Sequence, residues 1–356
     1  MEETLKKKHS YRSYTLAASF FLLIIAALVF IYFTQEPQPD PTSEKIIRQA
    51  VARQLNKDSN DLTDEDFARI SEVRLGLSQV SSSLTSPSQE LADLYILEKF
   101  SNLKTLRLEN INYPTNAIPK WMKILSKLGI YDLKKRFAID LKPLENLNSL
   151  QLLQIYNVPV KNIKPLAGLT NLQRLFLENL QLSDLKPIKE LINLKILGLN
   201  DSKVSDLQPL KDMVNLQNLF LDGTKVSNLE PLKGLKNLET LIVSNTLITD
   251  LGPLKDLVSL RQLFVHKTRV SDLEPIKGLV NLQDLYISRT EVTNLEPVKG
   301  LVSLKNLYMS ETRISDLEPL KGLANLQKLL IDGCNNISDE QVEELQKALP
   351  NPKIER

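Results

Sequence analysis

The apolar residues of this chain recur with a fixed period over more than half of its length. Nine prolines follow one another at intervals of 22 residues, at positions 143, 165, 187, 209, 231, 253, 275, 297 and 319. Counted from each proline, aliphatic residues return one, four, seven, ten, twelve, seventeen and twenty positions later. A proline in every period excludes a long helix, so each period is predicted to consist of short extended and turn-like pieces. Such units bury their apolar residues only by stacking on their neighbours, which predicts a solenoid.

Each period contains one stretch in which apolar and other residues alternate, between nine and thirteen positions after the proline. This alternation predicts a short β-strand in which two aliphatic residues face the core and the residue between them faces the opposite side. These outward residues form a column: Gln154, Phe176, Gly198, Phe220, Ile242, Phe264, Tyr286, Tyr308 and Leu330. Because five of the six aromatic residues after Pro143 occupy this column, it is predicted to be a surface of large side chains.

The motif L-x-x-L-x-L, followed by T-x-V-S-D-L-x-P-L-K-x-L, resembles the leucine-rich repeat. The resemblance is to the 22-residue class found in bacterial internalins, and it extends over residues 70–350. It implies an α/β fold: a curved horseshoe with a parallel β-sheet on the concave face, short 3-10 or turn segments on the convex face and helical caps at both ends. It also implies that the repeats bind proteins and have no enzymatic activity.

The chain is predicted to divide into seven segments. These are a basic cytoplasmic tail (1–13), an apolar span (14–33), a proline-rich linker (34–43), a helical N-terminal cap (44–70), irregular leucine-rich repeats with insertions (71–142), regular 22-residue repeats (143–338) and a C-terminal helical cap (339–356). Thr63 and either Ser338 or Asp339 stand where cap helices begin, as N-cap residues. Twelve strands are expected, three before Pro143 and nine after it.

Residues 14–33 contain no charge, glycine or proline over twenty positions. A helix of that length rises about 1.5 Å per residue and spans about 30 Å, the thickness of the hydrocarbon core of a bilayer. The segment therefore predicts a transmembrane helix and a single-pass membrane protein. Basic residues precede the span and acidic residues follow it, so the positive-inside rule predicts a cytoplasmic N-terminus and a periplasmic or extracellular repeat domain.

Several polar columns are expected to serve the fold. Asp or Asn stands three positions before each proline from Pro209 to Pro319, where it can cap the turn that the proline begins. The asparagine and threonine columns, represented by Asn215 and Thr224, are expected to hydrogen-bond backbone atoms of a neighbouring coil. A lysine follows seven of the prolines by two positions, and four of these lysines have a glutamate three residues earlier, which predicts weak surface ion pairs.

Composition narrows the class of function. The chain has 45 basic and 43 acidic residues, which argues against a dedicated nucleic-acid binder, because such proteins carry a basic excess. One cysteine and two histidines leave no basis for a cysteine zinc site, so neither a metal nor a cofactor is expected. No serine elbow, paired histidines or glycine-rich phosphate loop occurs, so neither an enzyme nor a small-molecule substrate is predicted.

The outward column is the candidate binding site. Its six apolar residues from Phe220 to Leu330 lie on neighbouring strands about 4.8 Å apart, so they would form a stripe about 24 Å long. Polar residues flank the stripe, and an apolar centre with a polar rim is typical of protein interfaces. The residues predicted to bind a protein partner are Phe176, Phe220, Ile242, Phe264, Tyr286, Tyr308, Leu330, Asp222, His266 and Asp284.

Two other functions stay open. In the first, the rings only pair across strands, at about 0.2 to 1 kcal/mol per pair, and the protein is a structural envelope component whose lysine row binds anionic polymer. In the second, the topology is inverted and the repeats are a regulatory subunit that faces the cytoplasm.

Overall fold

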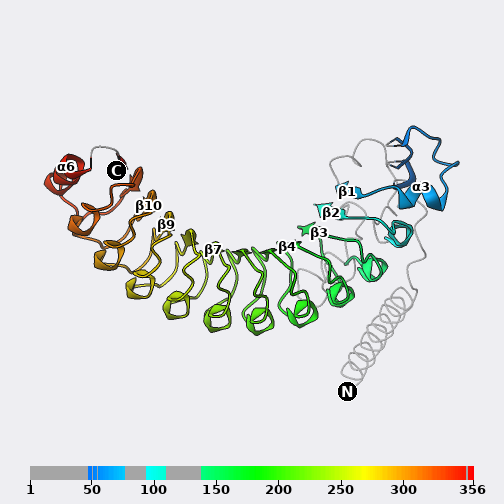
Figure 1. The fold of residues 1–356 in the computed structure, drawn as a ribbon, viewed down its shortest axis with the longest axis horizontal. Coiled ribbons are helices and arrows are strands. Elements are labelled where there is room, and N and C mark those ends of the chain that lie inside the picture. The colour runs from blue at the N-terminus through cyan, green and yellow to red at the C-terminus, as the bar shows by residue number, and fades with distance from the viewer. Residues whose placement is uncertain (1–46, 50, 54, 77–93, 110–137, 350–351) are drawn as a thin grey trace, which may run out of the picture. The chain divides into compact units, whose positions relative to one another are not determined.

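The computed structural model describes residues 47–49, 51–53, 55–76, 94–109, 138–349 and 352–356 of the chain. All of them belong to one compact unit, residues 41–356. Twelve parallel strands form a single sheet, in which each strand pairs with the next along the chain. In Figure 1 the strands line the inner, concave side of this unit's arc, and the 3-10 turns lie on its outer, convex side. The unit is therefore a solenoid of stacked coils.

The strands are three to five residues long. They are β1 (Glu72–Gly76), β2 (Thr105–Glu109), β3 (Leu152–Tyr156), β4 (Arg174–Glu178), β5 (Ile196–Gly198), β6 (Asn218–Phe220), β7 (Thr240–Ile242), β8 (Gln262–Phe264), β9 (Asp284–Tyr286), β10 (Asn306–Tyr308), β11 (Lys328–Leu330) and β12 (Lys353–Glu355). The α-helices whose bounds lie within the described residues are α3 (Asp64–Ala68) and α6 (Asp339–Ala348), and residues 47–49, 51–53 and 55 are also helical. The 3-10 turns are η2 (Tyr95–Lys99), η3 (Lys142–Leu144), η4 (Lys164–Leu166), η5 (Lys186–Ile188), η6 (Gln208–Leu210), η7 (Glu230–Leu232), η8 (Gly252–Leu254), η9 (Glu274–Ile276), η10 (Glu296–Val298) and η11 (Glu318–Leu320).

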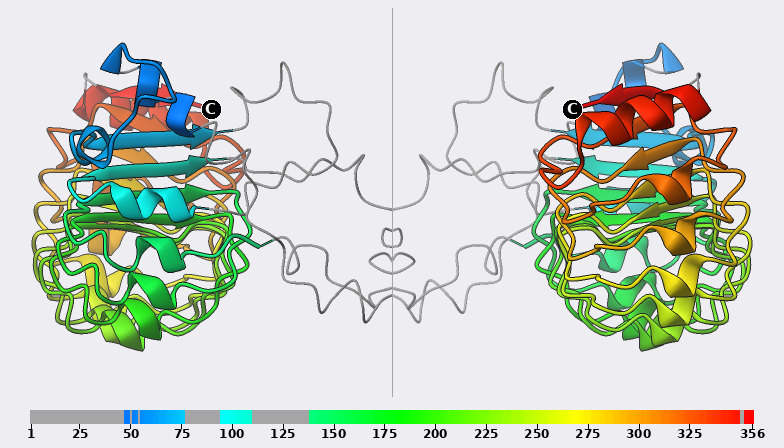
Figure 2. Two further views of the ribbon diagram at one scale, coloured as in Figure 1. Left: turned by 90° about the vertical axis from the view of Figure 1, so that its right-hand side faces the viewer. Right: turned by 90° about the vertical axis from the view of Figure 1, so that its left-hand side faces the viewer.

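The aliphatic positions of the period fill one continuous core between the sheet and the turns. In the coil after Pro231, for example, Leu232, Leu235, Leu241 and Val243 are all 0% exposed. Figure 2 shows the coils nearly end-on, each passing once through the sheet and once through the turn layer. Full burial of a leucine contributes about 1.5 to 3 kcal/mol, and each coil depends on both neighbours for that burial.

The proline stands in the first turn of each 3-10 segment from η3 to η11, where its missing N–H group is not needed. The acidic or amide residue before it caps this turn as predicted. Asp206 Oδ1 accepts a hydrogen bond from the backbone N–H of Gln208 at 2.9 Å. The same contact recurs in nine coils, from Asp140 to Asp316.

The asparagine column links neighbouring coils, as expected. Asn215 Nδ2 donates to the carbonyl oxygen of Ile192 at 3.0 Å, and Asn237 repeats the contact with Val214 at 2.9 Å. The prediction for the threonine column was wrong. Thr224 Oγ1 donates to the carbonyl oxygen of Leu221 in its own coil at 2.7 Å, because the chain turns back on itself directly after the strand.

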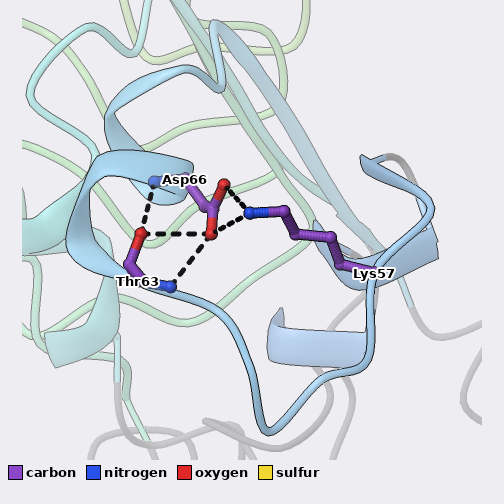
Figure 3. A network of polar contacts seen from close by, with 3 residues as sticks. All are labelled: Lys57, Thr63 and Asp66. Carbon is purple, nitrogen blue, oxygen red and sulfur yellow. Dashed lines mark hydrogen bonds and ion pairs between the residues drawn. The ribbon is translucent and has the colours of Figure 1, made fainter.

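Thr63 is the N-cap of α3, as predicted, and forms a capping box with Asp66. Asp66 Oδ2 accepts from the backbone N–H of Thr63 at 3.0 Å, and Asp66 Oδ1 accepts from Lys57 Nζ at 2.7 Å (Figure 3). The hydrogen bond from Lys57, followed by the one from Thr63, lowers the pKa of the buried Asp66 carboxyl to about 2. This network ties α3 to the loop that precedes it.

At the other end Ser338 is the N-cap of α6 and shares a capping box with Gln341. The chain then forms β12, which pairs in parallel with β11 and was not predicted from the sequence. Before Pro143 the structure describes two of the three expected strands, β1 and β2. The third was expected near residues 131–133, which lie outside the described residues.

The predicted fold class requires one correction, since it included a transmembrane helix. Within the residues that the structure describes, no helix is long and apolar enough to cross a bilayer. The predicted span, residues 14–33, lies outside those residues. The supported fold is the leucine-rich repeat solenoid, with its twelve-stranded parallel sheet and 3-10 turns, and the transmembrane helix is not supported.

Candidate functional site

The apolar residues predicted to form the site lie in register along the concave face. Phe220 on β6 pairs with Ile242 on β7, Ile242 with Phe264 on β8, and Phe264 with Tyr286 on β9. The column continues through Tyr308 on β10 to Leu330 on β11. Each of these side chains is partly buried, whereas the leucine before each of them is fully buried in the core.

Three rings of this column form a continuous stack. The ring centroids of Phe264 and Tyr286 lie 4.1 Å apart at an interplanar angle of 16°, and those of Tyr286 and Tyr308 lie 4.1 Å apart at 7°. Lys328 Nζ lies 5.4 Å from the centroid of the Tyr308 ring. Because the rings cover one another's faces, the stack presents ring edges and hydroxyl groups to a partner. Burial and a hydrogen bond with Tyr308 raise the pKa of Tyr286, so its hydroxyl is protonated at neutral pH.

A second ring pair lies closer to the N-terminus, where Phe176 on β4 and Phe220 stack with centroids 6.5 Å apart. Gly198 on β5 lies between them in the register. A Cβ atom at Gly198 would come within 2.6 Å of Phe176 Cδ1 and of Glu178 Oε1. Gly198 therefore makes room for the Phe176 ring to lean over its strand, a role that the column alone did not reveal.

Asp284, which was predicted to bind the partner, belongs to a ladder of hydrogen-bonded side chains at the start of the strands. Thr240 Oγ1 donates to Gln262 Oε1 at 3.0 Å, and Gln262 Nε2 donates to Asp284 Oδ2 at 2.7 Å. Asn306 Nδ2 donates to Asp284 Oδ1 at 2.6 Å. Both carboxylate oxygens of Asp284 thus already accept hydrogen bonds from this chain, and the ladder holds β7 to β10 in register beside the rings.

Asp222 and His266, also predicted to bind the partner, lie at the edge where the strands end. Asp222 Oδ1 accepts from Asn245 Nδ2 at 2.7 Å, and Ser244 Oγ lies 2.7 Å from His266 Nδ1. Burial lowers the pKa of His266. The charge of Asp222 raises this pKa, and the charges of Lys267 and Arg289 lower it further. His266 is therefore neutral at pH 7 and contributes hydrogen bonding, not charge, to this edge.

The third residue after each outward column residue has a left-handed backbone, which the sequence analysis did not identify. In nine successive coils it is Asn157, Asn179, Asp201, Gly223, Asn245, Lys267, Arg289, Glu311 and Gly333. Gly, Asn and Asp tolerate this conformation, whereas for other residues it costs about 1 to 3 kcal/mol. The three long side chains occur in the three coils that carry the ring stack. The interruption of the Asn/Asp/Gly column is visible in the sequence and could have indicated these residues.

The lysine row lies away from the rings, on the 3-10 turns. Of the four ion pairs predicted with a glutamate three residues earlier, three are present, Lys277 with Glu274, Lys299 with Glu296, and Lys321 with Glu318, and the pair of Lys233 with Glu230, both described residues, is not formed. These exposed pairs contribute little stability, but they neutralise the row in its C-terminal half. In the described part of the chain, no group of three or more His, Cys, Asp or Glu side chains is arranged to hold a metal ion.

A solenoid of 22-residue coils, each with one short parallel strand and one proline-initiated 3-10 turn, defines a class of protein built from leucine-rich repeats. The chain is a leucine-rich repeat protein with internalin-like structural neighbours: the family model described as "Leucine Rich repeats (2 copies)" matches residues 214–256 and 236–278. No curated protein matches the chain.

Among solved structures, the chain is similar to an internalin (inlF) from Listeria monocytogenes, with 22% identity, a TM-score of 0.60, and coverage of 89% of this chain and 97% of the internalin. It is also similar to the plant peptide hormone receptor RGFR1 in complex with RGF2, with 18% identity, a TM-score of 0.51 and coverage of 67% and 41%. The TLR13–ssRNA13 complex has 18% identity, a TM-score of 0.51 and coverage of 78% and 44%. At these identities the likeness shows the fold.

Proposed function

We propose that the repeats form a protein-binding module that captures a protein partner on its concave face. The ring stack of Phe264, Tyr286 and Tyr308 is its centre. One observation carries the proposal: the same three coils place Lys267, Arg289 and Glu311 in a left-handed backbone. Strain of this kind persists at binding sites because the side chain serves a purpose other than stability.

The geometry of the stack favours a protein over a nucleic acid as the ligand. Single-stranded RNA is bound by stacking its bases on the faces of aromatic rings. In this stack the inner faces are already covered at a centroid separation of 4.1 Å, so a ligand meets ring edges and tyrosine hydroxyls. Tyrosine presented in this way is frequent at the centre of protein interfaces. Of the two complexes among the neighbours, the peptide hormone receptor is the closer analogue of this proposal.

Sheet stabilisation is a second candidate role for the rings, and the short stacking distances favour it. Each ring pair would contribute about 0.2 to 1 kcal/mol to stability without any partner. This role explains neither the strained residues beside the stack nor the placement of five rings on the solvent side of the sheet. Binding of anionic polymer to the lysine row has less support, since Lys277, Lys299 and Lys321 are paired with glutamates.

Site-specific crosslinking tests the proposal. A photoreactive phenylalanine derivative at Tyr308 keeps an aromatic ring in the stack and is expected to crosslink one protein partner in intact cells. The control carries the same group at Val280, which is 47% exposed and lies in the turn between η9 and β9. An identical pattern of crosslinks from both positions, or none from Tyr308, would contradict docking on the concave face.

The location of the repeats outside the cytoplasm stays a prediction from the charge distribution of the N-terminal residues. Protease treatment of intact cells is expected to digest the repeats once any outer barrier is permeabilised. Protection that persists until the cytoplasmic membrane is disrupted would instead favour the regulatory role in the cytoplasm.

A further inference from the structure

The edge of the ring stack where the strands end is rich in hydrogen-bond donors and positive charge. After β8, β9 and β10 it carries His266, Lys267, Ser288, Arg289, Ser310 and Glu311. Lys267 is exposed and makes no ion pair within the part of the chain that the structure describes. Ser310 Oγ is buried and has no hydrogen-bond partner among the described residues.

Arg289 also retains free donors at this edge. Its Nε and Nη2 atoms both donate to Glu311 Oε1, at 2.8 and 2.5 Å. A guanidinium group has five N–H donors, so three are left for another acceptor. The pair with Glu311 fixes the direction of the guanidinium and balances its charge, so Lys267 supplies the net positive charge of this edge and Arg289 supplies hydrogen-bond donors.

The charge along this edge changes sign toward the N-terminus. Glu178 ends β4 there, and Asp201 and Asp222 follow β5 and β6. Asn200 donates to Glu178 Oε1 at 3.2 Å and accepts from the backbone N–H of Asp222 at 2.9 Å, and burial and the charge of Asp201 raise the pKa of Glu178. On the far side of the stack Asp332 is exposed. An anionic group would be repelled over both of these regions, so the edge attracts it only beside β8, β9 and β10.

The opposite edge of the stack carries charges of both signs. Lys305 Nζ donates to Gln283 Oε1 at 3.2 Å, while Lys328 Nζ lies over the Tyr308 ring and pairs with Glu355 at 3.4 Å. Arg261 lies 3.7 Å from Glu239 and is balanced by it. Of the carboxylates nearest the rings, Asp284 accepts hydrogen bonds at both oxygens and Glu311 is paired with Arg289.

We infer that the partner presents a short, extended acidic segment to this part of the concave face. Its Asp or Glu carboxylates contact Lys267 and Arg289, and an apolar side chain between them contacts the ring edges. The three coils span about 10 Å, which matches three residues of an extended chain. This inference rests on the proposed function, because it assigns the chemistry of the partner at the same site.

Three fluorescein-labelled peptides of equal length test the inference with the full chain. Each has the same central Phe, flanked on both sides by Asp, Ser or Lys residues. The aspartate peptide is expected to bind at least about tenfold more tightly than the serine peptide by fluorescence anisotropy, and the lysine peptide most weakly. The preference should vanish at about 1 M salt, where the Debye length falls to about 3 Å. Equal binding of the three peptides at low salt would overturn the inference.

The double variant Lys267→Asn/Arg289→Asn removes both charges and keeps the left-handed turns, since Asn157, Asn179 and Asn245 already occupy this conformation. It is expected to fold at least as stably as the wild type in urea and to lose the preference for the aspartate peptide. The control Lys255→Asn, on the turn layer, should retain that preference. A double variant that still prefers the aspartate peptide would also overturn the inference.

The variant Tyr286→Ser separates this inference from the proposed function. If this variant binds all three peptides more weakly, and the wild type shows no preference for the aspartate peptide, then docking on the rings is supported and the inference of an acidic partner segment fails. If it leaves every peptide unaffected while the charge preference persists, the rings are not the docking site and the proposed function fails. Weaker binding of the aspartate peptide, with the preference seen in the wild type, supports both.

Discussion

Three consecutive coils place a long charged residue, Lys267, Arg289 or Glu311, at a backbone position where six other coils have Asn, Asp or Gly. The φ angles are nearly the same in all of these coils, 52° to 56° for most residues and 69° to 71° for glycine. The left-handed conformation at this position therefore belongs to the coil and does not depend on which residue occupies it. The three residues that depart from the repeat pattern at this position indicate the candidate site better than the residues that follow it.

Lys267→Asn is expected to raise the free energy of unfolding by about 0.5 to 1 kcal/mol, because asparagine adopts the left-handed conformation with less strain. Urea denaturation of the full chain measures this change. The matched control Lys255→Asn, at a position with ordinary αR backbone, should leave stability unchanged. A destabilised Lys267→Asn protein would show that the lysine contributes to the fold and would remove the main support for the binding proposal.

The pKa of Asp66 predicts how the N-terminal cap responds to acid. Its value is about 2 in the folded chain and 3.8 ordinarily, so protonation favours the unfolded state. The contribution of Asp66 is fully present above pH 3.8 and is lost as the pH falls toward 2. The difference in free energy of unfolding between the wild type and Asp66→Asn should therefore shrink over this range. A constant difference would contradict the ion pair with Lys57.

At the scale of elements, the strands and turns from β3 to β11 could be predicted because every coil repeats one burial pattern around a proline. Two features could not. Residues 339–356 were predicted as a helical cap alone, but the few residues after α6 also form β12, since the end of a sheet offers unpaired backbone groups to any extended segment. The threonine contacts depend on how tightly the chain turns after each strand, and the repeat spacing does not contain that information.

The caps of the 3-10 turns provide a test at this scale. Asp272 Oδ1 accepts from the backbone N–H of Glu274 at 2.8 Å, so Asp272→Ala leaves that donor to water. The expected loss in free energy of unfolding is about 0.5 to 1 kcal/mol by urea denaturation. Ser271→Ala, at the exposed neighbouring position, should change stability by less than about 0.5 kcal/mol. Equal effects of the two substitutions would argue against capping.

At the scale of the whole repeat unit, nearly identical coils present a surface that varies along the arc. The concave column follows from alternation, so the positions of Phe176, Phe220 and the ring stack could be predicted from the sequence. The sequence did not predict that Asp284, Asp222 and His266 form hydrogen bonds with other side chains of this chain. These contacts depend on how far side chains extend from one coil to the next. The identity of the partner depends on the other molecule and is not contained in the repeats.

The most direct test of concave docking compares binding with stability in one variant, Tyr286→Ser, using the partner identified by crosslinking from Tyr308. Tyr286 is the middle ring of the stack, so its loss removes two ring contacts, each worth about 0.2 to 1 kcal/mol of stability. As the centre of an interface, it should weaken binding by about 2 kcal/mol or more, near thirtyfold in Kd. The account predicts that loss of affinity by calorimetry in a protein that remains folded; an unchanged Kd with reduced stability would show that the rings serve only the sheet.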